Sequence, residues 1–161
     1  MKKESSDTTI TSIIDTLEIL LRHHLPPEQT NETIEKLKLE LVLKYLHCDS
    51  LHKKVKGIND LTEILKKSIK NKIKTYTFYS MPTDPNAGYL DRGKMSEWLL
   101  QNKIIEYLFG PNTHQELLQR SNQIFVFIVQ EQKFEMAHLD LLWECCMVIK
   151  NFFFFLKYYF L

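Results

Sequence analysis

The sequence has little of the residue types that mark specialised classes of protein. Its 161 residues include only four glycines, five prolines and three cysteines, and the formal net charge is +1. So little glycine and proline argues against a disordered chain or a sheet-rich fold, and the balanced charge gives no general attraction to nucleic acid. The cysteines, of which Cys145 and Cys146 are adjacent, form no even disulfide framework. We therefore expect free thiols and an intracellular setting, in the cytoplasm or nucleus.

Several functional signatures are also missing. The first seven residues are polar and charged, without the apolar core and cleavage site of a secretory signal after them. The sequence has no glycine-rich phosphate loop, His-Glu-x-x-His pair or serine nucleophile elbow. Its most apolar stretch, 139–161, is interrupted by charged residues, whereas a membrane span needs about 20 mostly apolar residues. We expect neither a membrane span nor a cofactor.

Apolar residues recur at spacings of three and four along most of the chain, which is the pattern of amphipathic helices. The pattern fits a helical bundle or an α-solenoid segment, and the broad apolar faces of the second and fifth helices favour stacked layers. We therefore predict an all-α protein, an armadillo/HEAT-like α-solenoid segment of about six or seven helices. The expected helices lie near residues 10–21, 34–46, 51–69, 94–102, 113–129 and 136–147.

Turn and capping residues predict where these helices begin and end. Pro26-Pro27 ends the first helix, and Thr30 or Asn31 can cap the second. Gly57 lets a neighbouring helix approach the third, and Gly110-Pro111 separates two later helices. Asn112 or Thr113 can cap a continuous helix that carries apolar residues as far as Val129. We expect the face of the last helix that is directed towards the core to carry Leu139, Leu142, Trp143 and Cys146.

The chain divides into three parts. We expect an N-terminal helix and linker in residues 1–30 and a helical-repeat segment in residues 31–148, with a loop at 72–92. Composition then changes sharply, because residues 152–161 contain seven of the 19 aromatic residues. Such a segment has no clean helical period and would expose a large apolar patch if nothing covered it. We predict that the aromatic tail, 149–161, is foreign to the domain.

Residues capable of chemistry do not form a recognisable site. His47, Cys48 and His52 lie at or beside one helix end, where their side chains do not converge on a metal. Cys145 lies inside an apolar helix, not in the loop or helix N-terminus that lowers the pKa of a thiol. A small cysteine hydrolase that uses Cys145 and His138 is therefore only a third hypothesis. We predict no catalytic, cofactor-binding or metal-binding residue.

Lysine is the one charged residue that is strongly concentrated. Eight lysines lie within the 22 residues from Lys53 to Lys74, and only Asp60 and Glu63 offset them. Such a face can be simply solvated, or it can attract an acidic partner. It lacks the arginines and interleaved aromatic residues that stack nucleic-acid bases, so we expect protein partners and no nucleic acid. The candidate partner-binding face comprises Lys53, Lys54, Lys56, Lys66, Lys67 and Lys70.

Separated segments of the chain resemble one known family in their order and spacing. They are Lys36–Leu46, Lys53–Leu61, Met95–Ile104 and Leu139–Trp143. The third follows the family's Met-x-x-Trp-(hydrophobic)-x-x-Asn pattern. Over about residues 34–146, the sequence resembles a non-catalytic, armadillo-like helical-repeat region of the giant ubiquitin-specific proteases, which are very large deubiquitinases of the fat-facets type.

This resemblance implies a role in binding partners or positioning a protease domain. Catalysis in the family uses a Cys box centred on Gly-Asn-Thr-Cys and a His box, and neither Cys48 nor Cys145 has matching neighbours. We therefore expect a scaffold segment of a large cysteine-type deubiquitinase that is inactive alone. An independent helical adaptor without a protease is the alternative.

Overall fold

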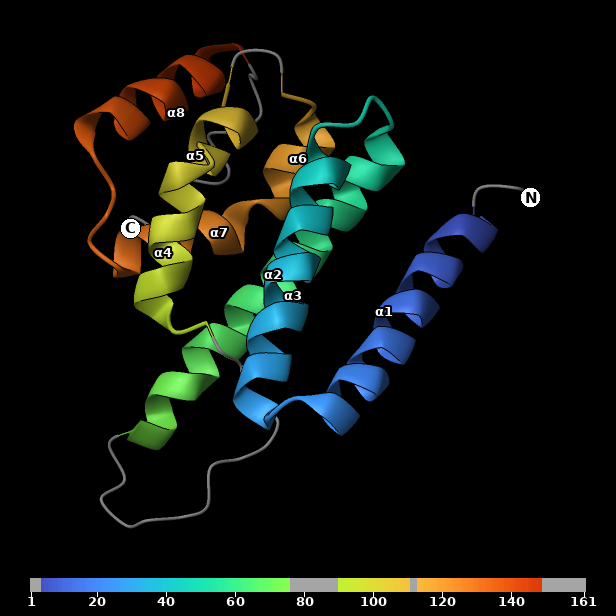
Figure 1. Cartoon of the computed structure of the whole chain (residues 1–161). Coiled ribbons are helices and arrows are strands. Elements are labelled where there is room, and N and C mark those ends of the chain that lie inside the picture. Colours follow the sequence, from blue (N-terminus) through green and yellow to red (C-terminus); the bar gives the residue numbers. More distant parts are fainter. Residues whose placement is uncertain (1–3, 76–89, 111–112, 149–161) are drawn as a thin grey trace.

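The computed structural model describes residues 4–75, 90–110 and 113–148, and every regular element in these ranges is an α-helix (Figure 1). The helices are α1 (Glu4–His24), α2 (Pro27–Leu46), α3 (Leu51–Thr75), α4 (Arg92–Gln101), α5 (Ile104–Leu108), α6 (Gln115–Arg120), α7 (Asn122–Gln130) and α8 (Met136–Val148). The all-α prediction is confirmed. The described ranges contain eight helices where six or seven were expected.

The long helix α3 lies at the centre of the packing. α2 runs beside it, and α4, α6 and α7 contact its other sides. At the edges, α1 packs mainly on α2, and α8 packs on α5. The apolar residues of α3, among them Ile58, Leu61 and Leu65, are buried because their spacing of three and four places them on one face. They join one core with residues of all the later helices, including Leu99, Ile105, Leu118, Ile128 and Leu142.

Two glycines permit close approaches. A Cβ atom added at Gly57 would lie 3.0 Å from the Cβ of Tyr45, so α2 and α3 can pack this closely only because the residue is glycine. This confirms the expectation for Gly57. A Cβ atom at Gly110 would lie 2.9 Å from the carbonyl oxygen of Glu106. Gly110 is thus required by proximity to the backbone and not by a positive φ angle.

The second helix begins earlier than expected. α2 starts at Pro27, with Pro26 as its N-cap, and the N–H of Thr30 donates to the carbonyl of Pro26 at 3.0 Å. Thr30 therefore lies inside the first turn, and the prediction that Thr30 or Asn31 caps the helix was wrong. The fixed φ of proline suits the first turn, where a missing N–H costs no helical hydrogen bond.

A short helix that was not expected, α5, follows α4, and one expected helix is divided in two. Lys103 adopts a left-handed conformation, with φ 50°, between α4 and α5. The continuous helix expected up to Val129 is instead interrupted at Ser121, whose hydroxyl donates to the carbonyl of Leu117 at 2.6 Å. The cap of α6 is His114, whose Nδ1 accepts the N–H of Glu116 at 3.2 Å. The cap predicted at Asn112 or Thr113 was therefore misplaced.

α3 extends into the first residues of the loop predicted at 72–92. α3 continues to Thr75, and residues 76–89 lie outside the described ranges. Leu90 is buried, and its N–H donates to the Oε2 atom of Glu35 at 2.8 Å. Asp91 then caps α4, because its side chain accepts the N–H of Lys94 at 2.8 Å. The hydrogen bond between Leu90 and Glu35 attaches the segment before α4 to α2.

The orientation of α8 differs from the prediction. Leu142 faces the core as expected, but Leu139 and Trp143 are exposed, and Cys145 is buried instead. The side chain of Cys146, like the tail 149–161, lies outside the described residues. Both sets of apolar residues have helical spacing, so periodicity alone could not select the buried one. None of the described helices is both long enough and apolar enough to cross a membrane.

Candidate functional site

Of the five lysines of the expected binding face whose side chains are described, all but Lys54 fall within about 140° of one another around α3 on an ideal helix. Lys56 and Lys67 are eleven positions apart, which places them about 20° from each other around the helix, and they line the same cleft. Lys54 lines a different cleft. Lys66 is exposed on the outer surface. Lys56 and Lys67 therefore share one cleft, and Lys54 belongs to another.

Lys53 and Lys70 are the remaining two lysines of the expected face. Lys53 is half-buried, and it lines neither of the two clefts. The side chain of Lys70 lies outside the described residues. The positive charge of Lys66 is offset by Glu63, whose Oε1 lies 2.8 Å from the ammonium. This i,i+3 pair is exposed and belongs to the kind that contributes little to stability.

The first cleft is lined by residues of α1, α2 and α3 and has a volume of about 270 Å³. We call it the α1–α3 cleft. Its apolar lining consists of Ile14, Leu41, Tyr45 and Ile64. Acidic and basic side chains from the three helices surround that lining, namely Asp15, Lys38, Lys56, Asp60, Glu63 and Lys67. The cleft can therefore accept a partner segment that presents both apolar and charged groups.

The two lysines of α3 in this cleft differ in their availability. The Nζ of Lys56 lies 3.3 Å from the Oδ2 of Asp60 and 5.9 Å from the ring centroid of Tyr45. Its charge is thus largely engaged within the chain. Lys67 is exposed and has no ion pair among the described residues. Lys67 is the better candidate to receive an acidic group from a partner.

An ion-pair network joins α1 to α2 near this cleft. The Oε1 of Glu18 lies 2.7 Å from Arg22, and its Oε2 lies 3.7 Å from Lys38 of α2. The hydrogen bond from Arg22, helped by the charges of both cations, lowers the pKa of Glu18 despite some desolvation. Glu18 therefore remains a carboxylate at neutral pH and attaches α1 to α2.

The second cleft lies between the first turn of α3 and the turn from α5 to α6, with a volume of about 480 Å³. We call it the α3–α6 cleft. Its lining comprises Asp49, Leu51, Lys54, Glu106, Tyr107, Gly110, Thr113, His114 and Leu117. The ammonium of Lys54 lies 5.6 Å from the ring centroid of Tyr107, and the hydroxyl of Tyr107 donates to the carbonyl of Leu46. Tyr107 thereby fixes one wall of the cleft.

The thiols do not form a reaction centre within the described residues. Cys145 is 2% exposed, and its burial raises the pKa of the thiol, which disfavours the nucleophilic thiolate. His138 lies seven residues earlier on α8, a rise of about 10 Å along the helix axis. Its Nδ1 accepts the N–H of Glu135 at 3.1 Å. The hypothesis of a hydrolase that pairs Cys145 with His138 has no support in this geometry.

Histidines and other possible ligands do not gather around a metal position. His47 contacts the ring of Tyr107, with centroids 5.3 Å apart, while Cys48 donates to the carbonyl of Tyr45 at 3.0 Å. In the described part of the chain, no three His, Cys, Asp or Glu side chains are placed to hold a metal ion.

Sequence reasoning missed both clefts because neither is formed by one helix. The α1–α3 cleft depends on how α1 lies against α2, and the α3–α6 cleft depends on the break between α5 and α6. Gly110, which lies at that break, was the only residue whose type indicated in the sequence that the chain turns there.

Comparison with known proteins identifies related sequences. A family model described as the ARM repeat of UBP24, USP9X and USP9Y matches residues 32–153. Human ubiquitin carboxyl-terminal hydrolase 34 is 25% identical over 121 residues, which are 73% of this chain and 3% of the relative. Mouse ubiquitin carboxyl-terminal hydrolase 9Y is 24% identical over 143 residues, which are 88% of this chain and 5% of the relative.

A third relative covers less of the chain. Ubiquitin carboxyl-terminal hydrolase puf of Drosophila melanogaster is 29% identical over 51 residues, which are 32% of this chain and 1% of the relative. The chain thus spans only 3% to 5% of the length of the human and mouse relatives described above. No solved structure matches it significantly.

Proposed function

Because the chain belongs to the ARM-repeat family of UBP24, USP9X and USP9Y, we propose that it is a non-catalytic, partner-binding segment of a large cysteine-type deubiquitinase. The observation that carries this proposal is the family match over residues 32–153, in a helical stack whose described cysteines are not arranged for catalysis. Stacked helices present extended surfaces, which suit protein binding better than chemistry. Such a segment acts inside the cell, where its thiols stay reduced.

An active-site probe tests the non-catalytic part of the proposal. The purified chain is incubated with ubiquitin that carries a thiol-reactive C-terminal group, beside a known cysteine deubiquitinase as positive control. We expect no adduct, because the thiol of Cys145 is buried and protonated. An adduct that disappears in Cys145→Ser would show that the segment is a cysteine enzyme after all.

Partner binding is assigned to the lysines beside the two clefts. Lys67 in the α1–α3 cleft and Lys54 in the α3–α6 cleft attract acidic segments of a partner protein. Charge reversal by Lys67→Glu and Lys54→Glu should weaken capture of a partner identified with the unmodified chain. Lys133→Glu is the matched control, because Lys133 is exposed and lies between α7 and α8, which contribute no residue to either cleft. Equal loss in all three variants would indicate an unspecific charge effect and reject the assignment.

The alternative function is an independent helical adaptor without a protease. The two differ in the size of the polypeptide that contains this sequence. An antibody against residues 32–148 should detect a protein far larger than 19.2 kDa if the segment belongs to a deubiquitinase. A band near 19.2 kDa as the sole product would favour the adaptor.

We also assign the folding unit to residues 31–148, with residues 1–30 as an N-terminal helix and linker and the tail beginning at 149. The family match reaches residue 153, so the first five residues of the tail fall inside it. Removal of residues 154–161 should leave the helicity and melting temperature unchanged. A large fall in either would mean that these residues belong to the fold.

A further inference from the structure

The buried side of α8 begins with a histidine. His138, Leu142 and Cys145 are 5%, 7% and 2% exposed, and their spacing of four and three residues places them in one row along the helix. Leu142 and Cys145 belong to the apolar core, so this row is the side by which α8 packs on the rest of the protein. His138 is the polar residue at the start of the row.

The imidazole of His138 also completes the N-terminus of α8. The carbonyl of Glu135, the residue before the helix, accepts the N–H of His138 at 3.0 Å. In return, the Nδ1 of His138 accepts the N–H of Glu135 at 3.1 Å. This second bond is one half of a capping box, with histidine in the place of the usual glutamate or glutamine. A nitrogen that accepts a hydrogen bond carries no proton, so the bond requires a neutral imidazole.

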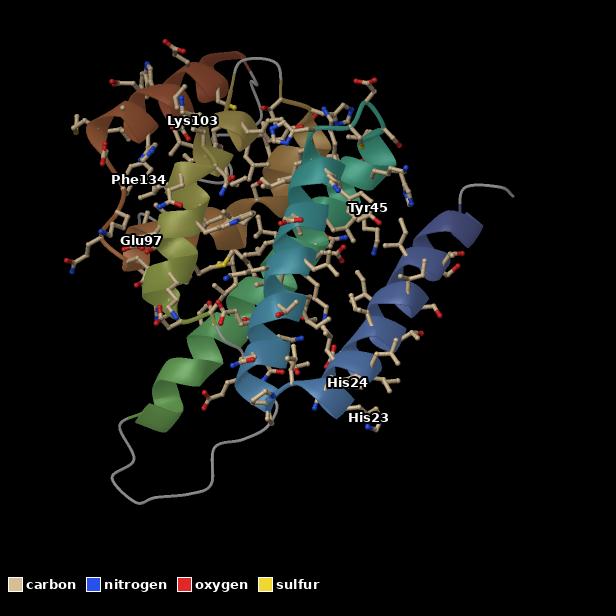
Figure 2. All side chains as sticks on the ribbon, in the orientation of Figure 1. His23, His24, Tyr45, Glu97, Lys103 and Phe134 are labelled. Carbon is tan, nitrogen blue, oxygen red and sulfur yellow. The ribbon has the colours of Figure 1, made fainter. Side chains whose placement is uncertain are left out.

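Aromatic contacts fix the position of the imidazole. Its centroid lies 5.6 Å from that of Phe134, in the segment before α8 (Figure 2). The ring of Phe134 meets that of Phe125 in α7 edge to face, at 5.2 Å, and Phe125 contacts Phe109 at 6.0 Å. The imidazole therefore cannot turn into water without disturbing the packing between α8 and α7.

The helices near His138 offer a protonated imidazole no anionic partner. α7 contains no titratable residue. The titratable residues of α5 are Glu106 and Tyr107, and both line the α3–α6 cleft. Lys103, just before α5, has the same charge as a protonated imidazole. Charge from these elements thus opposes protonation or does not act on it.

The charged residues in and before α8 also give little compensation. Lys133 is a cation, and Glu131 is already engaged in an ion pair with α4. Glu135 is exposed, so its carboxylate would have to leave water to pair with a buried cation. The positive end of the α8 dipole disfavours a cation in the first turn. The remaining charged side chains of α8 are exposed, namely Asp140 and Glu144.

We propose that His138 makes the docking of α8 sensitive to pH: α8 is packed on the core while the imidazole is neutral and loosens when it is protonated. Protonation removes the acceptor of the Glu135 N–H and places a cation in the buried row. Histidine changes charge between about pH 5 and 8, so the docking is complete in neutral solution and weakens in mild acid. This inference does not depend on the proposed partner binding, since α8 lines neither cleft.

His114 provides a comparison within the same chain. Its Nδ1 accepts the N–H of Glu116 at the start of α6, but its side chain is exposed. A protonated His114 stays in water, and water can also accept the released N–H. α6 should therefore respond to acid less than α8, because it is the burial of the imidazole that makes protonation costly.

Backbone amide exchange, followed by NMR on the full chain, tests the proposal helix by helix. Between about pH 7.5 and about pH 5.5, the protection factors of α8 should fall by about five- to tenfold relative to those of α3. His138→Gln should give the same protection at both pH values, because glutamine supplies the acceptor and does not titrate. His24→Gln is the matched control, because His24 is exposed in the last turn of α1, and it should respond like the unmodified chain.

Three results would overturn the proposal. Protection of α8 that is independent of pH in the unmodified chain would show that His138 does not control docking. An equal fall in His138→Gln would assign the effect to another group. An equal fall in every helix would show that α8 does not loosen separately from the rest of the fold.

The tautomer of His138 gives a second measurement that requires no variant to fold. The nitrogen chemical shifts of the ring distinguish the two tautomers and the protonated form. In neutral solution, Nε2 should carry the proton and Nδ1 should carry none, because Nδ1 accepts the N–H of Glu135. A proton on Nδ1 in neutral solution would reject the proposal.

Discussion

The central helix α3 and the first helix α1 have similar apolar spacing but different surroundings. On α3, Leu61 and Leu65 are buried because neighbouring helices cover the apolar side of the helix from several directions. On α1, Ile14 is buried against α2 while Ile13 remains exposed. The comparison shows that amphipathic spacing identifies a helix but does not say how many neighbours it has.

The same comparison predicts different local stability. Local unfolding of α3 would expose the core that it shares with α2, α4, α6 and α7. Local unfolding of α1 would disrupt chiefly its contact with α2. Segments with few buried apolar contacts open at the lowest free energy. We therefore expect α1 to tolerate substitutions that α3 does not.

The largest difference should come from matched truncations in the two helices. Leu61→Ala removes a fully buried side chain and should lower the free energy of unfolding by about 2 to 5 kcal/mol. Ile13→Ala removes a side chain that is mostly exposed and should change it by no more than about 0.5 kcal/mol. Chemical denaturation of dilute protein, followed by circular dichroism, measures both values. Similar losses for the two variants would mean that α1 is buried more extensively than its exposure indicates.

A smaller effect should come from Gly57→Val. The new Cβ would lie 3.0 Å from the Cβ of Tyr45, an atom that cannot move without its backbone, so α2 and α3 must separate. Such overpacking should cost about 1 to 3 kcal/mol of unfolding free energy. Asn59→Val is the control, because Asn59 is exposed on the same helix and has a similar helix propensity to valine. If both variants unfold at the same denaturant concentration, the close approach at Gly57 does not limit the packing.

Much of the fold could be predicted from local sequence, since helical periodicity located most of the helices and Gly57 indicated a close approach. The wrong predictions of buried residues arose where two rows of apolar residues fitted a buried helix face equally well. Both Trp143 and Cys145 lie on apolar rows of α8, and only tertiary packing decides that Cys145 is buried. The helix break at Ser121 gave no signal, because serine is tolerated in helix interiors and its hydroxyl bonds back to Leu117.

The candidate site could be predicted less well than the fold. The lysines of α3 were noticed as a group, but Lys54 points about 100° away from the adjacent Lys53, so the group does not line one cleft. Lys67 shares a cleft with residues of α1 and α2, and Lys54 shares another with residues of α5 and α6. Which residues share a cleft depends on how separate helices pack together. The spacing of residues within one helix gives no information about that packing.

The smallest effect concerns the ion pairs that attach α1 to α2. Folding lowers the pKa of Glu18, chiefly through its hydrogen bond with Arg22, so the contribution of Glu18 to stability is present above its unfolded pKa of about 4.3. That contribution is lost as the pH falls through the lower pKa of the folded chain. Glu18→Gln should therefore reduce the unfolding free energy by at most about 1 kcal/mol at neutral pH, and by less at high salt, because such exposed pairs are screened.

The pH dependence distinguishes this ion-pair effect from a loss of packing. Denaturation of the unmodified chain and of Glu18→Gln should give stabilities that differ at pH 7 and converge as the pH falls below the lowered pKa of the Glu18 carboxyl group. Lys36→Gln is a useful control, because Lys36 forms an i,i+4 pair with Glu32 within α2 and does not connect α2 to α1. A difference for Glu18→Gln that persists unchanged into acid would show that Glu18 supports α1 through its methylene groups and not through its charge. α1 would then depend on apolar contact alone, in the same way as α3 but with fewer neighbours.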